Sequence, residues 1–250
     1  MSTDQTMADL LKQKSGNVRI GIIGAMDEEV KLLKASLENR EDNTVAGFHI
    51  YTGKLHGKDI VLLKSGIGKV NAAIGTTILL QMFKPDCVIN TGSAGGFDPT
   101  LNVGDIVISS EVRHHDVDLT VFGYVYGQVP QQPASFLPDE TLAAVAERCI
   151  SRMGGINTVR GLIATGDQFM NDSARVERKR ALFPTMKAVE MEAAAIAQAC
   201  YQFATPFIVI RALSDIAGKE SGISFEQFLT TAAKHSAEMI IAMIDELAVN

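Results

Sequence analysis

The sequence has few of the residues that mark secreted, membrane or nucleic-acid-binding proteins. Its 250 residues include three cysteines, an odd number without a CxxC pair, which disfavours a disulfide framework and favours a reducing, cytoplasmic location. Basic residues number 23 against 29 acidic ones, and this net charge of −6 argues against a nucleic-acid partner. No apolar run approaches the ~20 residues of a membrane span, and residues 1–17 lack the apolar core of a secretory signal. We therefore expect no nucleic-acid partner, no membrane association and a cytoplasmic location.

Proline and charged residues are also too few for a disordered chain. Seven prolines, 21% charged residues and 46% apolar residues indicate a folded protein with a large core. The apolar share suits a sheet that is covered on both faces, or an oligomer interface. No linker or repeat divides the chain, so we predict one domain over residues 18–250. We expect the polar stretch 1–17 to be a flexible extension, either disordered or loosely helical.

Strand-like and helix-like segments alternate along this domain. Short apolar, β-branched runs predict strands at 18–24, 87–90, 105–109, 158–164, 188–189 and 206–213, and a hairpin at 48–53 and 59–65. Apolar residues at helical spacing predict helices at 26–37 and 138–152, and Ala-rich composition predicts helices at 69–82 and 190–203. We also predict a charged, exposed helix at 173–182 and a long closing helix at 224–247. Residues 119–137 predict a long loop. The alternation predicts an α/β fold, a three-layer α/β/α sandwich with a mixed, mostly parallel central sheet.

Polar residues follow most of the predicted strands. Because ligands of open α/β sheets bind beyond the carboxyl ends of the strands, these residues are candidates for a site. Structural roles compete with this interpretation, since acids favour helix starts and Asp215 could cap a helix. Glu192 is harder to explain structurally, because a charge within the apolar run AVEMEAAAIAQAC is costly unless it is paired or functional. The candidate groups are 27–29, 91–96, 166–169, 190–192, Arg211, Ser214 and Asp215.

Motifs for dinucleotides, ATP and serine nucleophiles are missing from the sequence. It contains no complete GxGxxG, no GxxxxGK[ST] loop and no GxSxG elbow. His114, His115 and Asp116 look like metal ligands, but adjacent strand residues point to opposite faces and no third ligand has the spacing of a zinc site. We therefore expect no cofactor and no metal.

Five segments at the predicted strand ends together resemble a known family. From about Arg19 to the last predicted helix, the chain is similar to the bacterial 5′-methylthioadenosine/S-adenosylhomocysteine nucleosidases of the purine nucleoside phosphorylase superfamily. VEMEAAA and RALSD are shared with phosphorylases, whereas GAMDEE favours the nucleosidases. The segments are GAMDEE at 24–29, SGIGKVNAA at 65–73, NTGSAGG at 90–96, VEME at 189–192 and RALSD at 211–215.

The resemblance implies hydrolysis of the N-glycosidic bond of 5′-methylthioadenosine and S-adenosylhomocysteine, and also of 5′-deoxyadenosine, to adenine and the corresponding ribose. It makes Asp215 the general acid that protonates adenine N7 and Glu29 the base that activates water, with Ser93 and Arg211 holding that water. A carboxyl group can donate a proton at neutral pH only if burial or neighbouring acids raise its pKa. We therefore expect such surroundings for Asp215.

The resemblance also implies how the substrate is bound. Glu192 and the Met191 backbone would bind the ribose hydroxyls, and Phe169 and the Met170 backbone would bind adenine. Ser214 would position Asp215. The remaining implied binding residues are Gly95 and the apolar wall around the 5′-alkylthio group, formed by Met26, Ile67, Met191 and Phe225.

A homodimer is the expected assembly. The family is dimeric, so the resemblance implies that Leu119, Phe122 and Pro130 of one subunit complete the 5′ pocket of its neighbour. The loop LTVFGYVYGQVP supports this independently, because an apolar, aromatic loop suggests a partner surface. An aromatic loop folded onto its own domain is the alternative.

Two other functions remain open at this stage. A phosphorylase of the same superfamily would need several cations around phosphate, whereas Arg211 is the single cation in the matching segments that we place beside the reacting carbon. Glu29 would repel phosphate but would help water. A nucleoside-binding protein without catalysis is the third possibility, and the complete set of Asp215, Glu29 and Glu192 argues against it.

Overall fold

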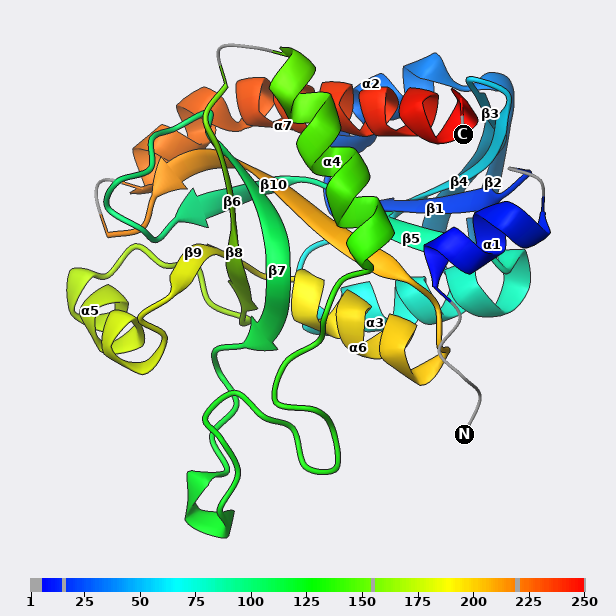
Figure 1. The fold of residues 1–250 in the computed structure, drawn as a ribbon. Helices are drawn as coiled ribbons and strands as arrows, with labels where there is room; N and C mark the ends of the chain where they lie inside the picture. The colour runs from blue at the N-terminus through cyan, green and yellow to red at the C-terminus, as the bar shows by residue number, and fades with distance from the viewer. Residues whose placement is uncertain (1–5, 15–16, 154–155, 219–220, 250) are drawn as a thin grey trace.

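A ten-stranded sheet runs through the protein (Figure 1). The computed structural model describes residues 6–14, 17–153, 156–218 and 221–249. The strand order is β2-β3-β4-β1-β5-β10-β6-β9-β8-β7, and β10 also pairs with β7, so the strands from β10 to β7 close into a ring. The strands are β1 (Arg19–Gly24), β2 (Glu38–Val45), β3 (Phe48–Leu55), β4 (Lys58–Lys64), β5 (Cys87–Asn90), β6 (Ser93–Gly96), β7 (Ile106–His114), β8 (Thr158–Thr165), β9 (Met186–Glu190) and β10 (Phe207–Ile216).

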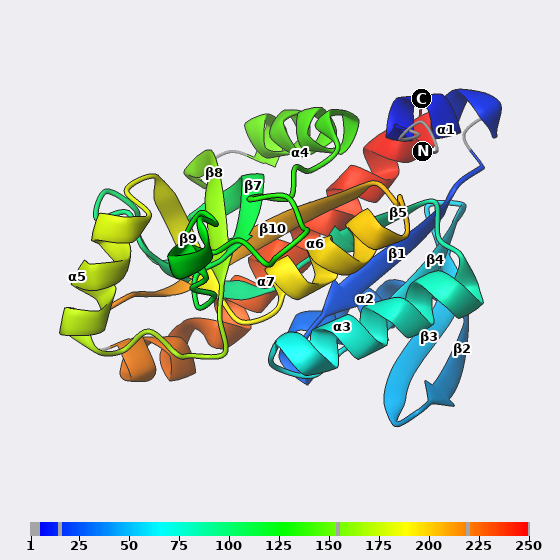
Figure 2. The same ribbon diagram turned by 90° about the horizontal axis from the view of Figure 1, so that it is seen from below.

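Helices cover both faces of this sheet, as Figures 1 and 2 show. Helices α2, α4 and α7 bury their apolar side chains against one face, and α3 and α6 bury theirs against the other. Helix α5 packs beside β8 and β9. The helices are α1 (Met7–Gln13), α2 (Asp27–Ser36), α3 (Lys69–Ile78) with its π-helical continuation η1 (Leu79–Phe83), η2 (Thr120–Phe122), α4 (Glu140–Met153), α5 (Ser173–Leu182), α6 (Ala193–Gln202) and α7 (Ser221–Val249).

The predicted fold class is confirmed by this three-layer arrangement and by the mixture of strand pairs. Parallel pairs run through β4-β1-β5-β10-β6 and through β9-β8-β7. The pairs β2–β3, β3–β4, β6–β9 and β7–β10 are antiparallel. The predicted hairpin corresponds to β3 and β4, and the long loop at 119–137 is irregular apart from the short η2.

Strand β10 shows how burial on both faces of the sheet produces the apolar run from which the strand was predicted. All of its residues from Phe207 to Asp215 are buried, because helices cover both faces of the sheet at this place. A strand in that position reads as a continuous apolar run. Its polar end, Arg211 to Asp215, lies inside the strand, which continues to Ile216. The sequence pattern placed the strand end at residue 213.

Further elements differ from the predictions, among them β7, which continues to His114 although the predicted strand ended at residue 109. Strand β2 is exposed and polar, and β6 has the sequence SAGG, so neither offers a β-branched apolar run. Helix α6 begins at Ala193 and not at residue 190, because β9 continues through Glu190.

Residues 7–13 are helical, which is one of the two alternatives for the extension 1–17, but they are packed against the domain. They form α1, whose Met7 and Leu10 are buried in the core cluster that α4 and α7 share. Thr6 and Asp9 form a capping box at its start, and the Met7 amide donates to Asp139 Oδ2 at 2.9 Å. Residues 1–5 and 15–16 lie outside the described residues.

The structure also describes the cysteines and the helices to which the expectations about disulfides and membrane spans refer. Cys87, Cys149 and Cys200 are buried free thiols. Within the described ranges, no helix combines the length and apolar character needed to cross a membrane.

Candidate active site

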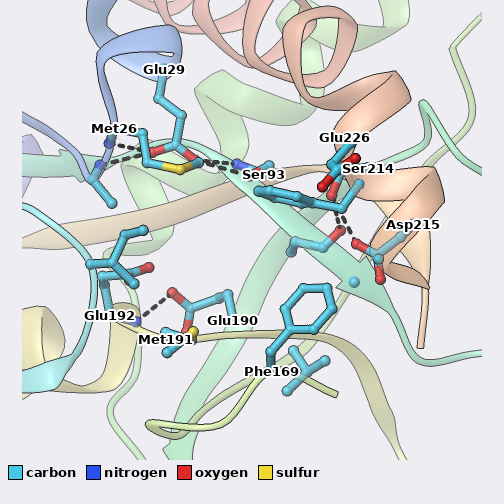
Figure 3. A pocket seen from close by; sticks show the side chains of 17 residues that line it. Met26, Glu29, Ser93, Phe169, Glu190, Met191, Glu192, Ser214, Asp215 and Glu226 are labelled. Atoms are coloured by element: carbon cyan, nitrogen blue, oxygen red, sulfur yellow. Dashed lines mark hydrogen bonds between the residues drawn. The ribbon is translucent and has the colours of Figure 1, made fainter. Parts of the chain in front are cut away.

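A cavity of about 390 Å³ opens where β1, β6 and β10 end (Figure 3). All five of the sequence segments singled out above contribute to it, together with the loop after β8 and the start of α7. Figure 3 shows Glu29 beside Ser93 on one side and Asp215 beside Ser214 on another. The predicted site residues that line the cavity are Met26, Glu29, Ile67, Ser93, Gly95, Phe169, Met191, Glu192, Ser214, Asp215 and Phe225.

Glu29 is held rigidly at the start of α2. Its Oε2 accepts hydrogen bonds from the amides of Ala25 at 2.8 Å and Met26 at 3.2 Å. Its Oε1 accepts from the amide of Ser93 at 2.9 Å and from its hydroxyl at 3.0 Å. Gly92 permits this approach, because a Cβ at that position would lie 2.6 Å from Oε1. The carboxylate is therefore fixed in orientation at the cavity wall.

Asp215 occupies a buried position at the cavity wall. The Ser214 hydroxyl donates to Asp215 Oδ1 at 2.9 Å, and Ser224 in turn donates to the Ser214 carbonyl at 3.1 Å. Burial raises the pKa of Asp215 to about 6, although the Ser214 hydrogen bond opposes the shift. Gly95 leaves room beside the other oxygen, since a Cβ there would lie 3.1 Å from Oδ2. Asp215 thus has the surroundings that we expected for a proton donor.

Glu192 lies at the start of α6, buried to 7% exposure but open to the cavity. Burial and the nearby Glu190 carboxylate raise the pKa of Glu192 to about 8. The Gly68 amide donates to its Oε1 at 2.9 Å. At neutral pH Glu192 is therefore mostly protonated, and a protonated carboxyl group can accept a hydrogen bond from one hydroxyl of a bound molecule and donate one to another.

Glu190 belongs to the candidate group 190–192, although the sequence assigned it no role, and it also lines the cavity. Its Oε2 accepts from Arg211 Nη2 at 2.6 Å and from the amides of Glu192 and Ala193 at 2.9 and 2.8 Å. Its Oε1 accepts from the Thr165 hydroxyl. The signal was its place at the end of a buried strand, two residues before Glu192.

Arg211 takes a different place from the one expected of a water-holding residue. It is 2% exposed, does not line the cavity and donates to Asn90 Oδ1 at 2.8 Å as well as to Glu190. Burial alone would lower the pKa of Arg211, but the carboxylates of Glu190, Glu29 and Glu192 raise it. Its positive charge therefore faces the acidic side of the site from behind Glu190.

An apolar wall completes the cavity. Met26, Ile67 and Met191 line it, and the rings of Phe169 and Phe225 meet edge to face with centroids 5.9 Å apart. Met170 is buried in a neighbouring core cluster and lines a smaller hollow that shares Gly95, Phe169 and Asp215 with the main cavity. Glu226 at the start of α7 also lines the main cavity and was not predicted.

The loop residues Leu119, Phe122 and Pro130 do not line this cavity. They belong to the segment between β7 and α4, which extends away from the sheet in Figure 1. Phe122 is 74% exposed and its neighbour Val121 is 84% exposed. Any contribution of these side chains to a site of this kind requires another copy of the chain.

His114, His115 and Asp116 do not form a metal-binding cluster. Across the residues that the structure describes, no group of three or more His, Cys, Asp or Glu side chains could hold a metal ion. His115 is fully buried, and burial lowers its pKa to about 4. His114 shares a hydrogen bond of 3.1 Å with Gln198.

Comparison with known proteins agrees with this geometry. The sequence profile of the phosphorylase superfamily matches residues 19–245. The 5′-methylthioadenosine/S-adenosylhomocysteine nucleosidase of Geobacillus sp. (strain WCH70) is 62% identical over 230 residues, which cover 92% of this chain and 99% of that protein.

Two solved structures of relatives also resemble the fold. The MTA/SAH nucleosidase of Colwellia psychrerythraea 34H, in complex with adenine, has a TM-score of 0.91 at 54% identity and covers 92% of this chain and 96% of its own. The nucleosidase of Neisseria meningitidis, in complex with methylthio-immucillin-A, has a TM-score of 0.90 at 50% identity, with coverages of 91% and 99%.

Proposed function

The chain belongs to the phosphorylase superfamily and, within it, to the 5′-methylthioadenosine/S-adenosylhomocysteine nucleosidases. From this premise we propose that it hydrolyses the N-glycosidic bond of 5′-methylthioadenosine and S-adenosylhomocysteine, and of 5′-deoxyadenosine, releasing adenine.

The charge of the cavity is the observation that carries the choice of water over phosphate. Among the described residues that line it, five are Asp or Glu and none is Lys, Arg or His. The nearest buried cation, Arg211, is already paired with Glu190. Arg211 neutralises only Glu190, so a phosphate anion would be repelled by the other acidic side chains that are ionised, whereas a ribosyl cation forming in the reaction would be stabilised by them.

Asp215 acts as the general acid. As the C1′–N9 bond breaks, its electron pair moves into the adenine ring, and N7 takes the proton from Asp215. The pKa near 6 keeps about one tenth of the molecules protonated at pH 7. The Ser214 hydroxyl occupies Oδ1, so Oδ2 beside Gly95 carries the proton.

Glu29 and Glu192 act on the ribose side. Glu29 accepts a proton from water while the water oxygen bonds to C1′, and Ser93 helps to fix the carboxylate that orients this water. Glu192 binds the ribose hydroxyls next to Met191. An acid and a base on different sides of the bond follow the logic of inverting glycosidases. Arg211 supports the site indirectly, through Glu190.

The remaining binding roles follow the same arrangement. Phe169 and the Met170 backbone bind adenine, while Met26, Ile67, Met191 and Phe225 surround the 5′-alkylthio group. A homodimer completes the pocket with Leu119, Phe122 and Pro130 of the partner subunit. The strong exposure of Phe122 supports this, because a large aromatic side chain is stabilised by burial.

Chromatography of the products in phosphate-free buffer tests the proposal. Purified protein incubated with 5′-methylthioadenosine should release adenine and 5-methylthioribose at an unchanged rate when phosphate is added. Turnover that requires phosphate, or that gives the ribose 1-phosphate, would assign a phosphorylase. Binding without any product would assign the silent nucleoside-binding protein.

A further inference from the structure

A closed ring of hydrogen bonds lies just outside the cavity and joins three separate loops. Asp116 Oδ1 accepts from Lys69 Nζ at 2.7 Å, and Asp116 Oδ2 accepts from the Asp167 amide at 3.0 Å. Asp167 Oδ1 accepts from the Lys69 amide at 2.8 Å. Each residue is therefore bonded to both others, and the ring links the start of α3, the loop after β7 and the loop after β8.

Two side chains of the ring, Lys69 and Asp116, are partly screened from water, whereas Asp167 is exposed, and none of the three reaches the cavity. The Lys69 and Asp116 side chains are 21% and 16% exposed. Partial burial would raise the pKa of Asp116, but the Lys69 ammonium and the Asp167 amide lower it, so the ion pair is formed at neutral pH. The backbone group that the ring holds directly is the Lys69 amide, which donates to Asp167.

The backbone that the ring holds is also the one that holds Glu192. Gly68 directly precedes Lys69, and its amide donates to Glu192 Oε1 at 2.9 Å. Gly68 has a φ of +94°, which favours glycine, and a Cβ there would lie 3.2 Å from Asp167 Oδ1. The direction of the Gly68 amide thus depends on the anchoring of Lys69 by Asp167 and Asp116.

We propose that Asp116, Lys69 and Asp167 are positioning residues that aim Glu192 at the ribose through the Gly68 amide. The inference rests on the proposed function, in which Glu192 binds the ribose hydroxyls. Asp167 also stands two residues before Phe169, so the same ring fixes the loop that carries the adenine-binding ring. The distinguishing prediction concerns the ribose hydroxyls, because only the path through Glu192 depends on them.

Two substrates separate the path through Glu192 from a general loss of structure. The kcat/KM of Asp167→Ala should fall about 10-fold on 5′-methylthioadenosine, as expected for one lost hydrogen bond to a charged group. On the 2′,3′-dideoxy analogue, which offers Glu192 no hydroxyl, the loss should be below about 3-fold. Asp167→Asn keeps an oxygen acceptor for the Lys69 amide and should restore most of the loss. Lys69→Met, a second variant with a similar stem, should show the same dependence on the substrate.

The matched control is Asp59→Ala, which breaks an exposed ion pair with Lys54 (2.9 Å) on β3 and β4. Equal losses on both substrates, or a loss in Asp167→Ala and Lys69→Met no larger than in the control, would overturn the positioning role. If the parent protein released no adenine, the proposed function would fail separately. Titration calorimetry with 7-deaza-5′-methylthioadenosine and its 2′,3′-dideoxy analogue would then still show whether the variants lose more affinity for the ligand that has ribose hydroxyls.

Discussion

Glu190 Oε2 lies 2.6 Å from Arg211 Nη2, and both side chains are at most 3% exposed. The pair joins the end of β9 to the middle of β10 and places a positive charge behind an acidic cavity. Glu190 Oε2 also accepts hydrogen bonds from the backbone amides of Glu192 and Ala193. One carboxylate therefore forms the ion pair with Arg211 and also binds the amides at the start of α6.

Removal of this charge should destabilise the fold. Glu190→Gln leaves Arg211 buried without its partner, so the free energy of unfolding should fall by about 3 kcal/mol or more. Urea denaturation measures it. Glu177→Gln, which breaks an exposed pair with Arg180, is the control and should cost below about 1 kcal/mol. Similar losses in the two variants would show that the buried pair is not special.

Asp215→Asn should reduce turnover while leaving nucleoside binding intact. Loss of a general acid lowers kcat by about 10²–10⁴-fold. Because the pKa of Asp215 is raised to about 6, the ratio of parent to variant kcat/KM should decline as the pH rises above 6. A pH series on both proteins measures this ratio. Cleavage of methylthioadenosine by the variant at the parent rate would remove Asp215 from the acid role.

The same substitution should stabilise the fold at high pH. The pKa of Asp215 is 3.8 in the unfolded chain and about 6 in the folded protein. The contribution of Asp215 to stability is therefore present at low pH and is lost as the pH rises through 6. Asparagine cannot ionise, so Asp215→Asn should raise the free energy of unfolding by about 3 kcal/mol at pH 8 and about 1.5 kcal/mol at pH 5. Denaturation curves at both pH values measure the gain. A gain that is larger at pH 5 would contradict the raised pKa.

Gly95→Ala should impair proton transfer without unfolding the protein. The new Cβ would lie 3.1 Å from Asp215 Oδ2 and 3.5 Å from Val189 Cγ1, so it would crowd the oxygen that carries the proton. We expect kcat to fall about 10-fold, as for a misplaced catalytic group, with the Tm within a few degrees. Steady-state kinetics and thermal denaturation measure both. A parental kcat would show that Oδ2 does not need this space.

Phe122→Ala tests the partner's contribution to the 5′ pocket. The affinity for 5′-methylthioadenosine should fall about 10-fold, as expected for a lost buried aromatic contact, while adenine binding stays within about 2-fold. Titration calorimetry measures both ligands. Leu182→Ala, which removes a side chain that is 46% exposed on α5, is the control. Equal losses for the two ligands would remove Phe122 from the 5′ pocket.

The predictable parts of the fold are those in which burial alone determines the sequence. Continuous apolar runs predicted β5 and most of β10. The bounds of α5 were also predicted, although this helix is charged and largely exposed. Strand β6 was not predicted, because its residues are Ser, Ala and Gly. At Gly95 and Gly96, neighbouring atoms occupy the space in which a side chain would otherwise lie. Those small residues make room for Asp215 and Leu213.

The sequence predicted that the site residues lie at the ends of strands, but it did not predict which acidic side chain forms an ion pair with Arg211. The position of Asp215 and Glu29 beside one cavity agrees with the resemblance. Which glutamate of the VEME segment pairs with Arg211 depends on the register of β9 and β10 around β6, which local sequence does not encode. The sequence therefore assigned Glu190 no partner, and the resemblance implied that Arg211 holds the attacking water, whereas the structure pairs the two residues.

The closure of β10 onto β7 leaves β2 as the exposed border of the described sheet. Open strand borders invite pairing with other molecules and so promote aggregation. Here the border carries the sequence ENREDNTV, of which six residues are exposed and two are half-buried, and its pairing with β3 is interrupted between Glu38 and Glu41. Charge and irregularity together make this border a poor template for another chain, so the protein should stay in solution at concentrations at which a smooth apolar border would precipitate.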